Sequence, residues 1–112
     1  MPRAKDPTEP IRERAAAFPD VADGPSCNQN SFKVGKASFL FIGPGRKGVG
    51  YKAMFRLKKS LPQAEKLAVK DPDRFEVGKT GYVTARFTAD KPLPKSIWEK
   101  WLRESYALAA GG

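Results

Sequence analysis

The 112-residue chain contains no histidine and only one cysteine, Cys27. These absences exclude a Ser-His or Cys-His nucleophile pair, an intramolecular disulfide, and a zinc site built from cysteine and histidine. A cysteine with no histidine to activate it is expected to be a structural loop residue. Because only carboxylates, lysines and tyrosines remain as catalytic groups, we expect a protein that is not an enzyme and has no cofactor.

Long apolar runs are also absent. The longest uncharged apolar run, residues 37–42, is far too short to span a bilayer. Residues 1–6 lack the apolar core of a signal peptide. We therefore expect a cytoplasmic protein without a membrane anchor. Its size predicts one domain over residues 6–110, preceded by a disordered arm over residues 1–5.

Acidic residues are missing from the whole segment between Gly24 and Ala64. The chain has a net charge of +9, and this segment contributes most of it. Its bases are Lys33, Lys36, Arg46, Lys47, Lys52, Arg56, Lys58 and Lys59. Clustered positive charge without neighbouring acids is typical of a surface that binds a polyanion. The alternative is a basic surface that only keeps the protein in solution.

Hydrophobic periodicity and turn residues predict the order helix, three strands, helix, two strands, helix. The helices are expected over residues 6–18, from a capping box at Ser60 and Gln63 to residue 69, and over 94–109. The strands are expected over residues 31–34, 37–42, 49–58, 75–78 and 81–88, and residues 20–30 read as a loop. The sequence therefore predicts an α+β fold, α-β(3)-α-β(2)-α, with a mostly antiparallel sheet packed by helices on one face.

Two strands alternate clearly between apolar and polar residues. Ala53 and Phe55 are predicted to face the core, and Val83, Ala85 and Phe87 to do the same on the last strand. Unpaired charges are too costly to bury, so the other side must be exposed to water. That side is predicted to carry Lys33, Lys52, Arg56, Lys58 and Arg86, with Tyr82 and Thr84 between them. Tyr82 is a candidate for stacking on a base.

Residues 43–48 spell G-x-G-x-x-G, but they lie between two strands. A dinucleotide site needs this motif at the start of a helix, so we do not predict one. We expect a basic hairpin tip instead, a wing that places Arg46 and Lys47 against phosphates. Lys79 would form a second wing. The alternative is an ordinary exposed turn.

Five segments, taken in order, resemble the MmcQ/YjbR family of small bacterial proteins. They are Ser31–Lys36, Tyr51–Leu57, Asp71–Phe75, Thr80–Val83 and Trp98–Leu102, and the resemblance covers roughly residues 6–109. It implies an α-β(3)-α-β(2)-α sandwich similar to type III secretion chaperones and frataxin-like proteins, and DNA binding through a double-wing-like pair of hairpins. Many members have a His-Pro pair where this chain has Asn30 and Ser31. The iron binding of frataxin fits poorly with a chain of charge +9.

The sequence therefore leads to one hypothesis and two alternatives. We expect binding to nucleic acid, duplex DNA first, through the phosphate backbone and with little sequence specificity. The candidate DNA-binding residues are Lys33, Lys36, Arg46, Lys47, Lys52, Arg56, Lys58, Lys79 and Arg86. The first alternative is a chaperone-like adaptor that holds an acidic protein or peptide, and the second is a small enzyme or ligand binder built on lysine and tyrosine. Oligomeric state stays open.

Overall fold

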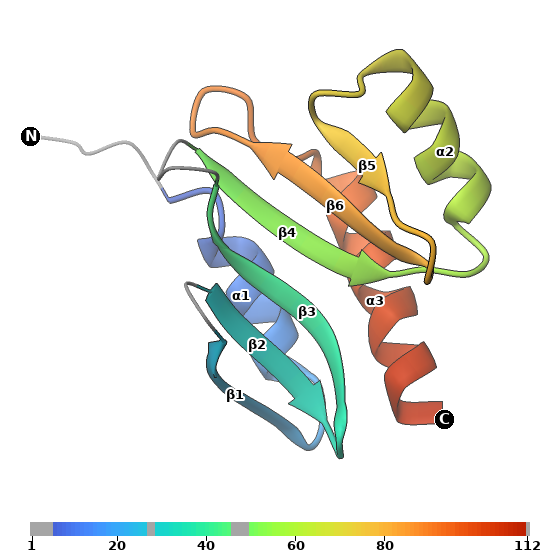
Figure 1. The fold of residues 1–112 in the computed structure, drawn as a ribbon. Helices are drawn as coiled ribbons and strands as arrows, with labels where there is room; N and C mark the ends of the chain where they lie inside the picture. The colour runs from blue at the N-terminus through green and yellow to red at the C-terminus, as the bar shows by residue number, and fades with distance from the viewer. Residues whose placement is uncertain (1–5, 27–28, 46–49, 112) are drawn as a thin grey trace, which may run out of the picture.

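Three helices and six strands make up the computed structural model, which describes residues 6–26, 29–45 and 50–111. They are α1 (Glu9–Ala17), β1 (Val21–Ser26), β2 (Gln29–Val34), β3 (Ala37–Pro44), β4 (Tyr51–Arg56), α2 (Leu61–Lys70), β5 (Phe75–Val77), β6 (Tyr82–Phe87) and α3 (Lys95–Gly111). The strands form one antiparallel sheet in the order β1-β2-β3-β4-β6-β5. Helices α1 and α3 cover one face of this sheet, and α2 lies beside β5 (Figure 1).

The predicted α+β class and the order of helices and strands are confirmed. The predicted arm over residues 1–5 lies outside the described residues. No helix in the described ranges is long and apolar enough to cross a membrane.

Strand β1 was not predicted, because residues 20–30 read as a loop. The structure pairs it antiparallel with β2, with Gly24 opposite Ser31 and Pro25 opposite Asn30. Glycine and proline are depleted in strands, and their presence hid this one. Proline is tolerated here because β1 is an edge strand, which forms a ladder on only one side.

The alternation predicted for β4 and β6 is confirmed. Ala53, Phe55 and Leu57 are buried, as are Val83, Ala85 and Phe87. They meet the inner stripe of α3, where Trp101 contacts the rings of Phe55 and Phe75 edge-on. The core therefore lies between the sheet and its helices, and the charged positions of the same strands are left on the opposite side.

The capping box predicted at the start of α2 is wrong. Ser60 makes no capping hydrogen bond with its side chain, and its hydroxyl donates instead to Glu104 Oε1 at 2.7 Å. Gln63 Oε1 accepts a hydrogen bond from Trp101 Nε1 at 3.2 Å. Both side chains are used for contacts with α3, which is far away in the sequence and which a local pattern does not reveal.

A β-bulge interrupts the pairing of β3 at Phe39. Phe32 is opposite Leu40 but Lys33 is opposite Ser38, so Phe39 has no partner on β2. Phe39 and Leu40 are both fully buried, although neighbouring strand residues normally point to opposite faces. The bulge thereby reverses the phase of the strand, so that Ser38 and Phe41 share a face.

Ser105 of α3 joins the bulge to the neighbouring strand. Its hydroxyl donates to the carbonyl oxygen of Phe39 at 2.6 Å and accepts from the backbone N–H of Arg56 at 2.9 Å. Ser105 is fully buried. One side chain therefore satisfies two backbone groups at the place where the pairing of β3 with β4 ends.

Replacing Ser105 with alanine is expected to lower the free energy of unfolding by about 1–3 kcal/mol, because a buried N–H and a buried C=O lose their partner. Urea denaturation followed by circular dichroism measures this. The matched control is Ser96→Ala, an exposed serine of the same helix, which should change stability by less than about 0.5 kcal/mol. Equal midpoints for the two variants would contradict the role assigned to Ser105.

Candidate functional site

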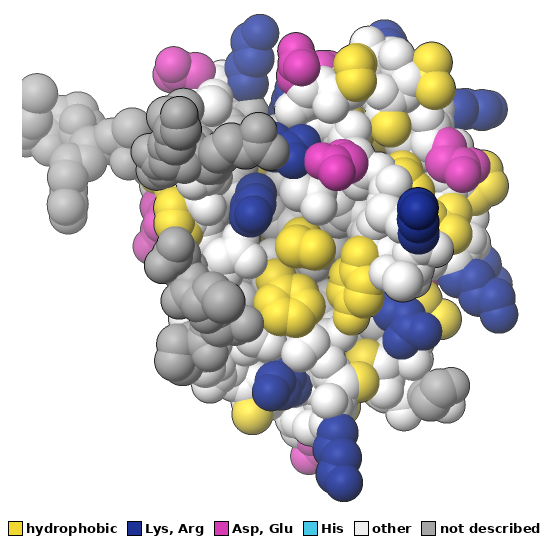
Figure 2. Space-filling model, in the orientation of Figure 1, with side chains coloured by type: hydrophobic (Ala, Val, Ile, Leu, Met, Phe, Trp, Pro, Cys, Tyr) yellow, Lys and Arg dark blue, Asp and Glu magenta, His cyan; other side chains and the backbone are white. Residues whose placement is uncertain are grey.

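The side of the sheet opposite α1 and α3, which we call the open face, is the surface seen in Figure 2. Cross-strand partners point to the same side of a sheet, so the strand register assigns residues to it. By that register it carries Ser31 and Lys33 of β2, Ser38 and Phe41 of β3, Lys52, Met54 and Arg56 of β4, and Tyr82, Thr84 and Arg86 of β6.

Four of the predicted site residues come together on the open face. They are Lys33, Lys52, Arg56 and Arg86. Lys52 lies directly opposite Arg86, a pairing of like charges that destabilises a sheet. The Lys52–Arg86 pair lies one residue from the end of the ladder between β4 and β6, and a polyanion bound to this face would relieve its repulsion.

One acid on the open face was missed by the sequence analysis. Glu76 of β5 lies opposite Thr84, and its Oε1 accepts from Arg86 Nη2 at 2.7 Å. The two side chains are 63% and 30% exposed, respectively, so water screens the pair. Among the described strand residues, the open face thus has four bases and this one acid.

The remaining predicted bases lie at turns or outside the described residues. Lys36 is exposed in the turn between β2 and β3, and Lys79 is exposed between β5 and β6. Arg46 and Lys47 lie outside the described residues, as does Cys27.

Tyr51 is opposite Phe87 and Arg56 is opposite Tyr82, so Gly50 and Gly81, which precede β4 and β6, lie at opposite ends of β4. Of the two predicted wings, the first, with Arg46 and Lys47, lies outside the described residues, and the second, with Lys79, lies near the Arg56 end of β4. The turn before β4 requires a glycine at residue 50, where φ is +65° and a Cβ would lie 2.9 Å from the carbonyl oxygen of Phe87.

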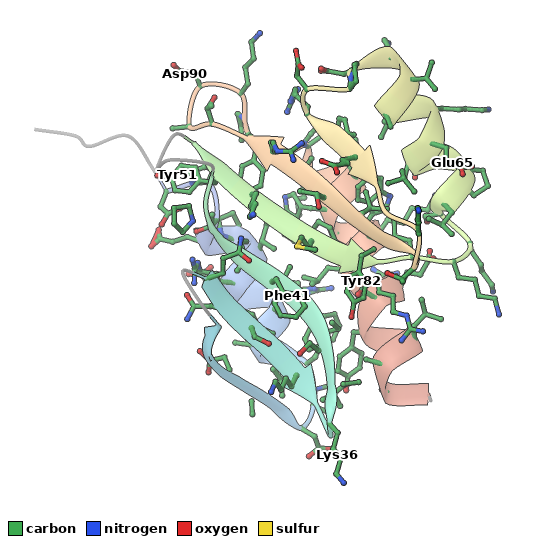
Figure 3. The ribbon with its side chains drawn as sticks, viewed as in Figure 1. Lys36, Phe41, Tyr51, Glu65, Tyr82 and Asp90 are labelled. Atoms are coloured by element: carbon green, nitrogen blue, oxygen red, sulfur yellow. The ribbon has the colours of Figure 1, made fainter. Side chains whose placement is uncertain are left out.

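An apolar row crosses the centre of the open face; strand alternation in the sequence predicts Met54 and Tyr82 on this face, but not Phe41. Phe41 and Met54 are opposite each other, and the rings of Phe41 and Tyr82 are 6.3 Å apart at 59°. All three side chains are half-buried. Figure 2 shows apolar side chains at the centre with basic ones around them, and Figure 3 labels the two rings on β3 and β6.

The orientation of these rings has a structural cause. Phe41 points outward because the bulge at Phe39 reverses the phase of β3. Tyr82 reaches across β4, since its hydroxyl donates to the carbonyl oxygen of Ser38 at 3.4 Å. Period-2 alternation without knowledge of the bulge could not predict that Phe41 lies on this face.

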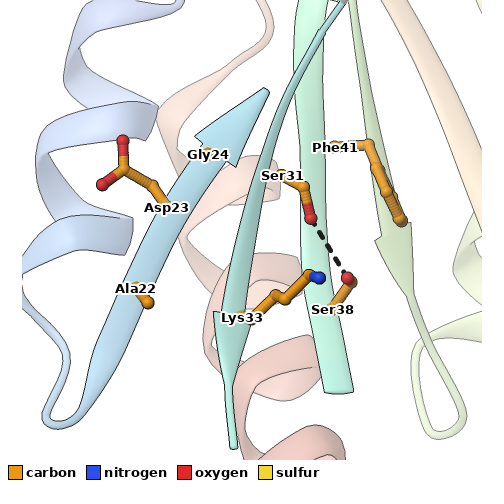
Figure 4. Close-up of a pocket in the computed structure, with 7 residues that line it drawn as sticks. All are labelled: Ala22, Asp23, Gly24, Ser31, Lys33, Ser38 and Phe41. Carbon is orange, nitrogen blue, oxygen red and sulfur yellow. Dashed lines mark hydrogen bonds between the residues drawn. The ribbon is translucent and has the colours of Figure 1, made fainter. Parts of the chain in front are cut away.

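Beside Phe41 the open face is hollowed into a trough of about 500 Å³. Its lining consists of Ala22, Asp23, Gly24, Ser31, Lys33, Ser38 and Phe41. Small side chains leave the space open, and the hydroxyls of Ser31 and Ser38 share a hydrogen bond of 3.1 Å. In Figure 4 the Lys33 side chain extends toward Ser38, and the Asp23 carboxylate points away from both.

Beyond Arg86 the basic surface continues around the end of the sheet. A second hollow of about 380 Å³ is lined by Arg86 together with Tyr51, Arg74 and Lys91. Arg74 is held there, because its Nε donates to the carbonyl of Arg86 and its Nη2 to the carbonyl of Lys91, both at 3.4 Å. The described residues contain no group of three or more cysteine, aspartate or glutamate side chains placed to hold a metal ion.

Comparison with known proteins supports the fold. No protein-family model matches the sequence, and no curated protein matches it significantly. The crystal structure of the Deinococcus radiodurans protein DR2400, described as a DUF419 domain, is similar with a TM-score of 0.68. The two share 18% sequence identity over 96% of this chain and 81% of the other. DUF419 is a family like MmcQ/YjbR, so the likeness agrees with the fold that the resemblance implied.

Lys58 does not line the open-face trough; it follows the end of β4 and borders a separate cavity of about 420 Å³ beside α3. Lys59, Lys100 and Arg103 line the same cavity around Glu104. The Glu104 carboxylate accepts from the backbone N–H of Lys58 at 2.6 Å and from that of Ser60 at 3.1 Å. The carboxylate of Glu104, a residue of α3, therefore caps the start of α2, where the sequence predicts a local capping box.

These contacts determine the pKa of Glu104. Burial raises the pKa, but hydrogen bonds from the Lys58 N–H, the Ser60 hydroxyl and the Ser60 N–H lower it. The resulting pKa lies below the ordinary value of 4.5. In the unfolded chain these hydrogen bonds are lost and the pKa is higher. The stabilisation is therefore fully present above the unfolded pKa and is lost as the pH falls through the lower, folded pKa.

Glu104→Gln is expected to lower the free energy of unfolding at pH 7, and the difference from the unmodified protein should shrink as the pH falls below about 4.5. Urea titrations between pH 3 and 7 measure both effects. Glu99→Gln, on the same helix, is the control and should show a smaller difference at every pH. A difference that stays constant from pH 7 to pH 3 would refute the carboxylate cap.

Proposed function

We propose that this chain binds nucleic acid through the open face of its sheet and that it belongs to the MmcQ/YjbR family. The supporting observation is the arrangement of charge on that face. Among the described strand residues, four basic side chains share it with one acid, and two of the four lie directly opposite each other. Phosphates of a nucleic acid would supply the missing counter-charges, and contacts to phosphates carry no sequence information. We therefore propose binding with little sequence specificity.

The described basic side chains are spaced so that they could contact several phosphates. Lys52 and Arg56 lie four residues apart on β4, about 13 Å at the usual rise of a strand. Lys33, on β2, lies on the other side of the central apolar row from Lys52. Basic side chains on both sides of the apolar row leave room for a nucleic acid that lies along the face. Lys36 and Lys79, at the turns, would extend the contact at its margins.

A non-enzymatic role in the cytoplasm stays a prediction from the sequence.

The double variant Lys52→Glu, Arg56→Glu is expected to weaken binding equally on unrelated nucleic acid sequences. Fluorescence anisotropy with labelled 20-nucleotide DNA, single-stranded and duplex, measures it at several salt concentrations. The slope of log K against log salt should fall in magnitude by about 2, since each phosphate contact contributes about 0.7–0.9. The control Lys66→Glu, Lys70→Glu makes the same charge change on exposed residues of α2. Unchanged binding by the β4 variant would refute this site.

The adaptor alternative is tested with the same equipment. Poly-glutamate of similar length competes for a surface that recognises only negative charge or an acidic protein. Displacement of the DNA at equal charge concentration would favour the adaptor, and failure to displace it would favour nucleic acid.

Glu76→Gln is expected to strengthen nucleic acid binding, because it removes the one acid of the described open face and releases Arg86 from its ion pair. The salt slope should increase in magnitude by about 1. Glu65→Gln provides the matched control, since Glu65 is exposed on α2, away from the open face (Figure 3). If both variants bind alike, Arg86 does not contribute to the site.

A further inference from the structure

We propose that the open face binds single-stranded nucleic acid, with an unpaired base stacked on Phe41 in the trough. This inference rests on the proposed function and specifies its ligand. The sequence led to duplex DNA as the expected partner, because charge alone does not distinguish a duplex from a single strand. The centre of the open face makes that distinction.

The apolar row at the centre of the open face disfavours a duplex. A duplex presents phosphates to a broad surface and keeps its bases inside. The major groove is about 12 Å wide and admits a helix or a two-stranded ribbon. The lysines and arginines of the open face extend from β2 to β6, which is three strand spacings or about 14 Å before side chains are added. Phe41 and Met54, at the centre of that width, would then face sugars and phosphates, with which they make no favourable contact.

A single strand fits the same residues without this conflict. Its bases have two exposed π-faces, and they stack on aromatic side chains while lysine and arginine contact the backbone. The open face has this arrangement, with Phe41 and Tyr82 at its centre and lysine and arginine side chains on both sides. Sheets that bind RNA through aromatic side chains on two central strands use the same physical principle.

The trough beside Phe41 offers room for a nucleobase. Its volume of about 500 Å³ is at the low end of the range for small-molecule sites and is ample for one nucleobase. A base placed there contacts the Phe41 ring, and its phosphate lies within reach of Lys33. Ser31 is buried, but Ser38 is half-buried, and its hydroxyl can donate to or accept from a base edge. Because hydroxyls pair with any base, the trough should accept different bases.

The two rings of the open face are held in fixed orientations by neighbouring contacts. The Tyr82 hydroxyl is bonded to the Ser38 carbonyl, and the bulge at Phe39 fixes the direction of Phe41. The aromatic side chains are therefore held in place before a ligand arrives. A preorganised aromatic surface loses little conformational entropy on binding, which favours stacking there.

The test compares three labelled ligands by fluorescence anisotropy with the full chain: a dT20 strand, a U20 strand, and a 20-base-pair duplex. We expect at least one single strand to bind about tenfold more tightly than the duplex at equal salt. The comparison of dT20 with U20 then assigns the ligand to DNA or RNA. Binding of neither strand nor duplex would refute the proposed function itself. Duplex binding equal to or tighter than that of both strands would refute only the single-strand inference.

Substitutions of Phe41 test whether a nucleobase stacks on its ring. Phe41→Leu keeps the side chain apolar but removes its π-face, and Phe41→Ala removes it entirely. Both should weaken binding of the preferred single strand by about 5-fold to 150-fold, the range for one stacked base, and change duplex binding by less than about twofold. Phe18→Leu is the matched control, because Phe18 is also half-buried but packs on Phe39 and Tyr106 on the helical side. It should leave both affinities unchanged.

Folding of each variant is checked by circular dichroism before titration. Should Phe41→Ala fail to fold, Phe41→Leu decides the outcome. Single-strand affinity that is unaffected by Phe41→Leu, in a protein that still binds single strands, would overturn the assignment of the base to the trough.

Discussion

The bulge at Phe39, with the Ser105 hydroxyl that completes it, is the constraint on which the candidate site depends. A strand that gains one residue reverses the alternation of its side chains beyond that point. Without the extra residue, Ser38 and Leu40 would share a face and Phe41 would point toward the helices. With it, Phe39 and Leu40 both enter the core and Phe41 faces water. The cost is a carbonyl and an N–H outside the regular ladder, and Ser105 satisfies both.

This arrangement couples the core to the open face through one helix. The stripe of α3 that packs Trp101 and Leu102 against the sheet also presents Ser105 to the bulge. The next residue of α3 is Tyr106, whose ring contacts Phe39 edge-on. The position of Phe41 and of the Arg56 backbone is therefore fixed from behind by buried contacts. A site held by the core of the sheet is more rigid than one built on loops, which suits a stacking surface.

The outer frame of this fold could be predicted from the sequence because local patterns determine it. Ala53, Phe55 and Leu57 alternate with Met54, Arg56 and Lys58, and charge cannot be buried unpaired, so the orientation of β4 and of Arg56 could be predicted. The features that were missed are set by contacts between distant segments. Ser60 is bonded to a carboxylate 44 residues away, and Phe41 takes its direction from a bulge. The charge of the site and the place of Tyr82 could therefore be predicted from the sequence, whereas the orientation of Phe41 could not.

Charge and aromatic content impose different requirements on a ligand, and the open face has both. Bases alone would bind any polyanion, including an acidic peptide or a duplex, with an affinity that salt weakens. Half-buried rings add an interaction that depends weakly on salt and requires a flat apolar partner. Unpaired nucleotides combine a charged backbone with such a partner at every residue. Glu76, the one acid among the described strand residues of the open face, lies beyond Thr84 at the β5 edge and leaves the middle of the face to the basic side chains and rings. The combination thus favours a single strand over ligands that offer charge alone.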